Sequence, residues 1–96
     1  MKVSNFNSLQ DFLRSNDVFS RFGIKRIGVF GSFVRNEKFN DIDLLIEDNL
    51  DFENRNALKA FLEKELEIKI DLVQKDLAEP IILHRAMKDI RYATIN

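Results

Sequence analysis

The chain has 96 residues, 45% of them hydrophobic and 32% charged, which is typical of one globular domain and excludes a disordered segment. Its net charge of -1 argues against general nucleic-acid binding, and the absence of cysteine excludes disulfides, thiolate metal ligands and a cysteine nucleophile. Because 96 residues are too few for two domains, we expect a single domain over residues 1–96. No apolar run is long enough for a signal peptide or a membrane span, so we expect the protein in the cytoplasm.

The first half of the chain predicts one helix and two strands. Apolar residues at helical spacing predict a helix over residues 7–22, with Asn7 or Ser8 as its N-cap. Residues 24–30 are short, rich in β-branched side chains and followed by glycine, which predicts a first strand. Residues 41–47 predict a second. Because only a short polar segment joins these two strands, we expect them to pair antiparallel.

The second half predicts a helix, a strand and a final helix. Asp51 is a candidate cap for an amphipathic helix, which is followed by a third strand over residues 67–73. A helical crossover between the second and third strands favours parallel pairing. The last helix is expected within residues 78–90. The order predicts an α/β (α+β) domain, with a small mixed β-sheet and helices packed on one face.

Side chains alternate between the two faces of a strand, so the predicted sheet has an apolar face and a carboxylate face. The apolar face, expected against the helices, carries Ile27, Val29, Ile42, Leu44, Ile46, Ile68, Ile70 and Leu72. The opposite face carries Asp41 and Asp43 on the second strand and Asp71 on the third. We expect Gly28 on the first strand to keep this face open.

The three carboxylates point to a metal site. Residues two apart on a strand lie roughly 6.5–7 Å apart on the same side, so Asp41 and Asp43 can reach one cation, and Asp71 can complete a triad. Converging carboxylates repel one another unless a cation or a proton intervenes, and oxygen ligands favour Mg²⁺ or Mn²⁺ over Zn²⁺. Mg²⁺ is commonly shared with substrate phosphates, and Gly31-Ser32 at a strand end offers a phosphate backbone N–H groups and a hydroxyl.

The segment FGSFVRNEKFNDIDLLIE, together with the later KIDLV, resembles the signature of the minimal nucleotidyltransferase (MNT) family. This family belongs to the DNA polymerase β-like superfamily, with its palm-like fold. The resemblance implies that Asp41 and Asp43 bind metal and that Asp71 is the third acidic residue. It also implies that Gly31 and Ser32 hold the triphosphate of a nucleotide. ATP is the donor that the resemblance implies.

The resemblance also implies partners. Many family members are antitoxins that silence a HEPN-family ribonuclease toxin by transferring AMP from ATP to a toxin tyrosine. We therefore expect a Mg²⁺-dependent nucleotidyltransferase and a small helical HEPN-type partner, or failing that a homodimer.

The sequence departs from the pattern of the family at two points in the segment before the aspartates. Only eight residues separate Ser32 from Asp41, fewer than is common in the family, and Asn36 stands where relatives usually have Gly.

Other interpretations of single residues stay open. An isolated Asp-x-Asp is more often an exposed strand edge than a metal site. Arg35 is either a phosphate ligand or an ordinary turn charge, and Lys69 can form a structural pair with Asp71. His84, the only histidine, is more simply a surface residue, and Tyr92 more simply a packing residue than a nucleotide acceptor.

Two functions without catalysis are the alternatives to the enzyme. One is an antitoxin that acts only by forming a complex, and the other is a nucleotide-sensing subunit. The triad favours the enzyme, because a protein that acts by binding alone does not need three converging carboxylates.

Overall fold

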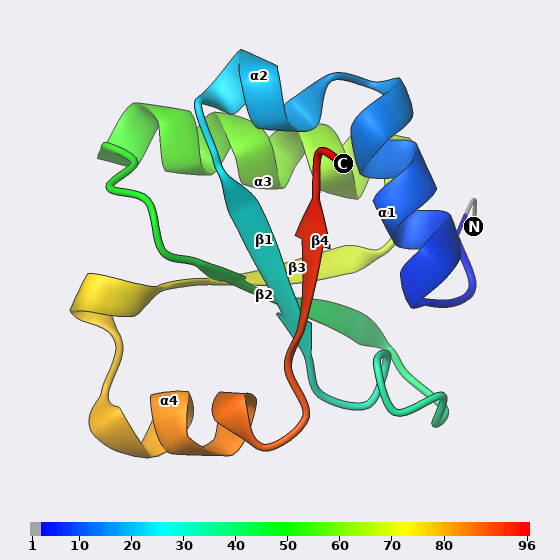
Figure 1. Ribbon diagram of the computed structural model, residues 1–96, viewed down its shortest axis with the longest axis vertical. Coiled ribbons are helices and arrows are strands. Elements are labelled where there is room, and N and C mark those ends of the chain that lie inside the picture. The colour runs from blue at the N-terminus through cyan, green and yellow to red at the C-terminus, as the bar shows by residue number, and fades with distance from the viewer. Residues whose placement is uncertain (1–2) are drawn as a thin grey trace.

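A mixed four-stranded sheet with helices on both sides makes up the computed structural model, which describes residues 3–96 (Figure 1). The elements are α1 (Phe6–Ser15), α2 (Val18–Phe22), β1 (Arg26–Phe30), β2 (Asp41–Ile46), α3 (Phe52–Leu66), β3 (Lys69–Gln74), the 3₁₀ helix η1 (Lys75–Leu77), α4 (Pro80–Met87) and β4 (Arg91–Thr94). The strand order is β3-β2-β1-β4, in which β1 is antiparallel to β2 and β4, and β2 is parallel to β3. The mixed sheet and both predicted pairings are confirmed, whereas β4 was not predicted.

The predicted first helix is two helices, α1 and α2. Asp17 interrupts them in a left-handed conformation, with φ of 53°, which no helix can continue. The predicted N-cap, Asn7 or Ser8, was also wrong, because Asn5 caps α1. The Ser8 backbone N–H donates to Asn5 Oδ1 at 2.8 Å, and Ser8 Oγ accepts from the Asn5 N–H at 3.1 Å. This reciprocal capping box starts the helix at Phe6, one residue before the predicted start at residue 7.

The start of α3 agrees with the prediction and the start of β3 does not. The Asn54 N–H donates to Asp51 Oδ1 at 2.8 Å, so Asp51 caps α3 as expected. β3 begins at Lys69 rather than at residue 67, because Glu67 ends α3 in a left-handed conformation with φ of 55°. The strand also extends one residue further, to Gln74.

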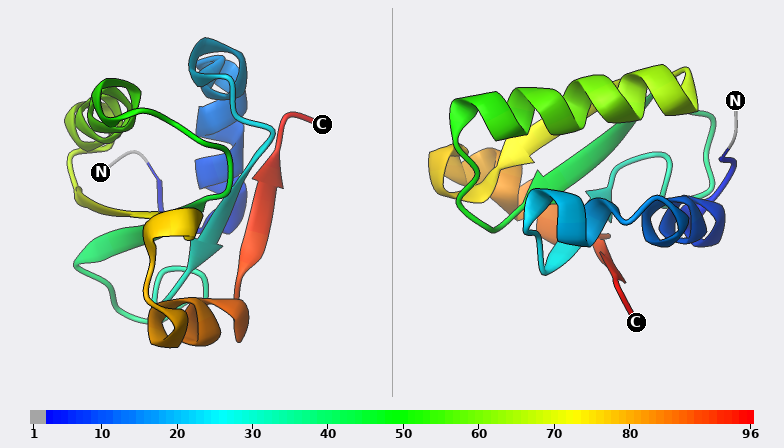
Figure 2. Two further views of the ribbon diagram at one scale, coloured as in Figure 1. Left: turned by 90° about the vertical axis from the view of Figure 1, so that its left-hand side faces the viewer. Right: turned by 90° about the horizontal axis from the view of Figure 1, so that it is seen from above.

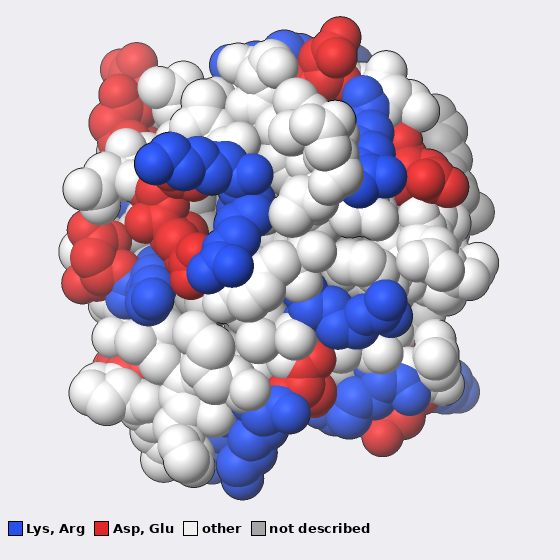
Figure 3. Space-filling view, viewed as in Figure 1, with Lys and Arg blue, Asp and Glu red and all other residues white. Residues whose placement is uncertain are grey.

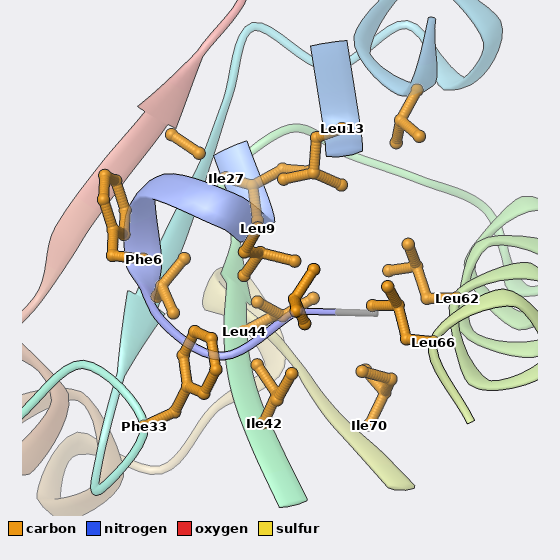
Figure 4. Close-up of a cluster of buried hydrophobic side chains, with 14 of the residues drawn as sticks. Phe6, Leu9, Leu13, Ile27, Phe33, Ile42, Leu44, Leu62, Leu66 and Ile70 are labelled. Carbon is orange, nitrogen blue, oxygen red and sulfur yellow. The ribbon is translucent and has the colours of Figure 1, made fainter. Parts of the chain in front are cut away.

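The apolar face of the sheet meets α1, α2 and α3, as predicted, and forms the main core (Figure 4). The fully buried side chains of this core include Leu9, Leu13, Ile27, Val29, Ile42, Leu44, Ile46, Leu58, Leu62, Leu66 and Ile70. Burial of these aliphatic side chains on one side of the sheet fixes which way each strand faces. The carboxylate face is therefore turned away from this core.

The second face of the sheet is also covered in part, so the prediction that the helices pack on one face holds for α1, α2 and α3 but not for α4. α4 lies on the side of the molecule away from α2 and α3 (Figures 1 and 2), with Ala86 fully buried. Ile90, which follows α4, packs over the strands: a Cβ placed on Gly28 would lie 2.5 Å from Ile90 Cδ1 and 3.3 Å from Leu45 Cβ. The expectation that Gly28 keeps this face open was wrong, because Gly28 makes room for Ile90.

The surface agrees with the near-neutral net charge. On the face shown in Figure 3, basic and acidic side chains are interspersed rather than gathered into one basic area. Within residues 3–96, no helix combines the length and the apolar character needed to cross a membrane.

Candidate active site

The three aspartates of the sequence pattern come together at one end of the β2–β3 pair. Asp41 is the first residue of β2, and Asp43 lies directly opposite Asp71 in the parallel register. Carboxylate oxygens of the three residues lie within 4.8 Å of one another. The structure thus produces the convergence that the sequence pattern indicates, with each residue partly exposed.

The burial of these carboxylates, together with their convergence, raises the pKa of Asp41 and Asp43. Burial, followed by the negative charges of Asp41 and Asp71, raises the pKa of Asp43 to about 6. Burial, and then the hydrogen bond and negative charge of Asp71, also raise the pKa of Asp41. Lys69 Nζ lies 3.8 Å from Asp71 Oδ1, but the lysine side chain is 66% exposed, so this pair gives weak compensation. Asp41 and Asp43 therefore hold protons more tightly than isolated aspartates do, and the cluster would favour a cation.

The segment between β1 and β2 is a compact turn held by two phenylalanines. Phe33 is buried, and its ring meets Phe39 edge to face with centroids 4.8 Å apart. The Glu37 N–H donates to the Ser32 carbonyl at 3.1 Å, which closes the turn. Asn36 has φ of 60°, a left-handed conformation that glycine and asparagine adopt most readily. Gly31 and Ser32 directly follow β1, and Gly31 lies beside the acidic cluster.

Gly31 lies against the acidic cluster. Its φ is 81°, in the region that favours glycine, and a Cβ at this position would collide with Asp43 Oδ2. The backbone of the Gly-Ser pair therefore approaches a carboxylate of the cluster closely enough that a side chain at residue 31 would displace it.

Gly31→Ala is expected to destabilise the protein by about 1–2 kcal/mol from the left-handed backbone alone, and to displace Asp43 as well. Gly23→Ala is a matched control, because Gly23 also has a positive φ, of 64°, but nothing lies within 4 Å of its Cβ position. Urea unfolding should show a loss of stability in both variants. Only Gly31→Ala should also reduce the thermal stabilisation by Mg²⁺ with ATP, and an equal reduction in Gly23→Ala would contradict the assignment of Gly31 to the site.

Arg35 projects from the same turn and is already paired. Its guanidinium forms an ion pair with Asp89 through Nη1 and with Glu37 through Nη2, the second at 3.1 Å. These hydrogen bonds, that of Asp89 first, raise the pKa of Arg35. Asp89 also accepts the Gly31 N–H at 3.4 Å. The sequence analysis missed Asp89, because it lies 54 residues from Arg35 and no local pattern connects the two.

The remaining candidates lie apart from this arrangement. His84 is exposed in the last turn of α4. The Tyr92 hydroxyl donates to Glu47 Oε2 at 3.2 Å, and the guanidinium of Arg26 lies 3.7 Å from the centre of the Tyr92 ring. Tyr92 is thus a packed residue of β4, which agrees with the simpler of its two interpretations.

Comparison with known proteins identifies the family. Residues 7–92 match the family model described as polymerase beta, nucleotidyltransferase. The protein adenylyltransferase MntA of Thermococcus cleftensis is 36% identical over 80 residues, which cover 75% of this chain and 77% of the relative. A candidate protein adenylyltransferase of Methanocaldococcus jannaschii is 31% identical over 97 aligned residues, covering 94% of this chain and 99% of the relative.

A solved structure supports the same fold. It is that of the tri-AMPylated HEPN toxin of Shewanella oneidensis in complex with an MNT antitoxin. One of its chains superposes on this one with a TM-score of 0.60 at 26% identity, over 88% of this chain and 71% of that chain. The chain therefore belongs to the polymerase beta nucleotidyltransferase family and, within it, groups with the protein adenylyltransferases.

Proposed function

We propose that the protein transfers AMP from ATP to a tyrosine hydroxyl of a HEPN-type partner protein and acts as the antitoxin of that partner. The observation that carries the proposal is the convergence of Asp41, Asp43 and Asp71 within 4.8 Å, next to the Gly31-Ser32 backbone. Such an arrangement combines ligands for a cation with hydrogen-bond donors for phosphate oxygens, and phosphoryl transfer needs both in one place.

The residues of the acidic cluster fit Mg²⁺ or Mn²⁺. All the donors are carboxylate oxygens, which these hard cations prefer. Burial first, and then the negative charges of Asp41 and Asp71, raise the pKa of Asp43, and a bound cation would counter both effects. Bound divalent cations would neutralise the triphosphate and the charge that develops on the pyrophosphate leaving group. Asp41 and Asp43 would hold these cations from β2, and Asp71 would add a ligand from β3.

The chain's own groups would orient the two substrates. The backbone at Gly31 and Ser32, with the Ser32 hydroxyl, would bind the triphosphate, and the guanidinium of Arg35 would add a positive charge to it. Asp71 would take the proton from the acceptor hydroxyl as its oxygen attacks the α-phosphorus. The bond from the α-phosphorus to the bridging oxygen would break, so that pyrophosphate leaves and AMP stays on the acceptor.

The choice of acceptor rests on the relatives. One related structure holds a HEPN toxin that carries AMP groups in complex with an MNT antitoxin, and two relatives bear the name of protein adenylyltransferases. The acidic cluster lies on the sheet face away from the main core, where a partner could reach it. A protein hydroxyl is therefore the acceptor that we propose, with ATP as the donor.

The proposal is tested by incubating the protein with a HEPN-type protein encoded beside it, ATP and Mg²⁺, and measuring the intact mass of the partner. We expect a mass increase of one or more AMP groups. Asp43→Asn should abolish the increase, whereas Asp76→Asn, an exposed acidic residue of η1, should leave it unchanged. A stable complex without any mass increase would contradict the enzyme and support an antitoxin that acts by binding alone.

A further inference from the structure

Asp89 is a partly buried acidic residue in the segment between α4 and β4, and it contacts the proposed triphosphate site. Its side chain is 19% exposed, compared with 45% for Arg35 and 57% for Glu37. One carboxylate oxygen, Oδ1, accepts the Gly31 N–H at 3.4 Å, and the other, Oδ2, pairs with the guanidinium of Arg35. A single anion thus engages a backbone N–H and an arginine at once.

The two donors that Asp89 engages are suited to a phosphate group. Backbone N–H groups at a glycine turn and arginine side chains are the usual protein ligands of phosphate oxygens. Both donors also lie next to the acidic cluster, since Gly31 abuts Asp43 and the positive charge of Arg35 acts on the same carboxylate. The carboxylate of Asp89 thus occupies two donors that are suited to a nucleotide phosphate.

We propose that Asp89 sets the nucleotide affinity of the site by competing with the triphosphate for the Gly31 N–H and the Arg35 guanidinium. This inference rests on the proposed function, which assigns both donors to ATP. When the protein groups that bind a ligand are free only part of the time, the apparent affinity for that ligand falls in proportion to the free fraction. The negative charge of Asp89 adds repulsion of the triphosphate, which ends when the carboxylate is removed.

The two acidic partners of Arg35 differ in how well they can compete. Glu37 contacts only Nη2 of Arg35, and its side chain is more than half exposed, so water screens its charge. Asp89 is better shielded from water and also holds Gly31. Glu37 is for this reason a matched control, an acidic partner of the same guanidinium without the second contact.

The inference is tested by calorimetric titration of the full-length protein with ATP in the presence of Mg²⁺. Asp89→Asn keeps the size of the side chain and removes its charge, and we expect it to bind ATP about tenfold more tightly than the parent protein. Glu37→Gln should stay within about twofold of the parent. In a protein that carries Arg35→Gln, adding Asp89→Asn should change the affinity by much less than it does in the parent.

The direction of the change in ATP affinity distinguishes competition by Asp89 from a merely structural role of this residue. If Asp89 only braced the turn, Asp89→Asn would lower both the affinity for ATP and the melting temperature. Unchanged or weaker binding in a folded Asp89→Asn variant would therefore overturn the inference, and so would a failure of both proteins to bind ATP. Tighter binding without transfer of AMP to any partner would leave the inference standing and contradict the proposed function.

Discussion

Asp71→Asn is expected to bind ATP with Mg²⁺ within about tenfold of the parent protein, yet to transfer AMP at least about a hundredfold more slowly. Asp71 stands on β3, opposite Asp43, whereas Gly31 and Ser32 approach the cluster from the end of β1. The nucleotide can therefore be held without Asp71. The carboxylate would act when the acceptor hydroxyl attacks, and loss of such a general base costs on the order of 10² to 10⁴ in rate.

The measurement is single-turnover transfer to the partner, combined with a separate ATP titration. Lys69→Met is the matched control, because Lys69 is the charged partner of Asp71 and is itself largely exposed. It should retain transfer within a few fold, as expected for a weak surface pair. Parental transfer by Asp71→Asn would mean that Asp71 is only the structural partner of Lys69.

Replacing Asp41 and Asp43 together by Asn should abolish the rise in melting temperature that Mg²⁺ with ATP gives the parent protein. A ligand that binds only the folded state stabilises it in proportion to the logarithm of its concentration relative to Kd. Loss of the proposed cation ligands is therefore expected to remove the whole effect. Differential scanning fluorimetry with and without the ligands measures it. Asp76→Asn with Glu53→Gln removes the same charge from exposed positions and should keep the rise.

The same double variant should be more stable than the parent when no cation is present and the pH is above about 6. The folded pKa of Asp43, about 6, exceeds its ordinary value of 3.8, so the folded state binds more protons than the unfolded state between these values. The stability that this group contributes is present below the ordinary value and is lost as the pH rises through about 6. Asn at this position does not ionise. A double variant that is less stable than the parent at pH 8 would contradict the expected destabilisation of the folded state by ionised Asp43.

The alternation of side chains made the acidic cluster predictable from the sequence. Ile42 and Leu44 must enter the core, which forces Asp41 and Asp43 to the opposite face. The buried Ile70 fixes the facing of β3 in the same way, and the parallel register then sets Asp71 beside Asp43. Burial of one face thus determines the position of polar residues on the other.

Long-range packing accounts for what the sequence did not predict. β4 is only four residues long, and its alternation is too brief to separate it from a helix end. The break at Asp17 depends on one residue in a left-handed conformation, which the apolar spacing on either side conceals. The contacts of Gly28 with Ile90 and of Asp89 with Arg35 exist only once the α4–β4 segment has folded back over the sheet.

The strand order also bears on how the molecule folds. β1 pairs with β2 across a short turn, but its other partner is distant, since the Gly28–Tyr92 pair joins residues 64 positions apart. The entropy lost in closing a loop grows with its length, so we expect β4 to dock late in folding. Ala93→Gly would then accelerate unfolding far more than it slows refolding, which stopped-flow kinetics can measure, and the opposite ratio would contradict late docking. The acidic cluster of β2 and β3 would thus be assembled before the Asp89 carboxylate reaches Arg35.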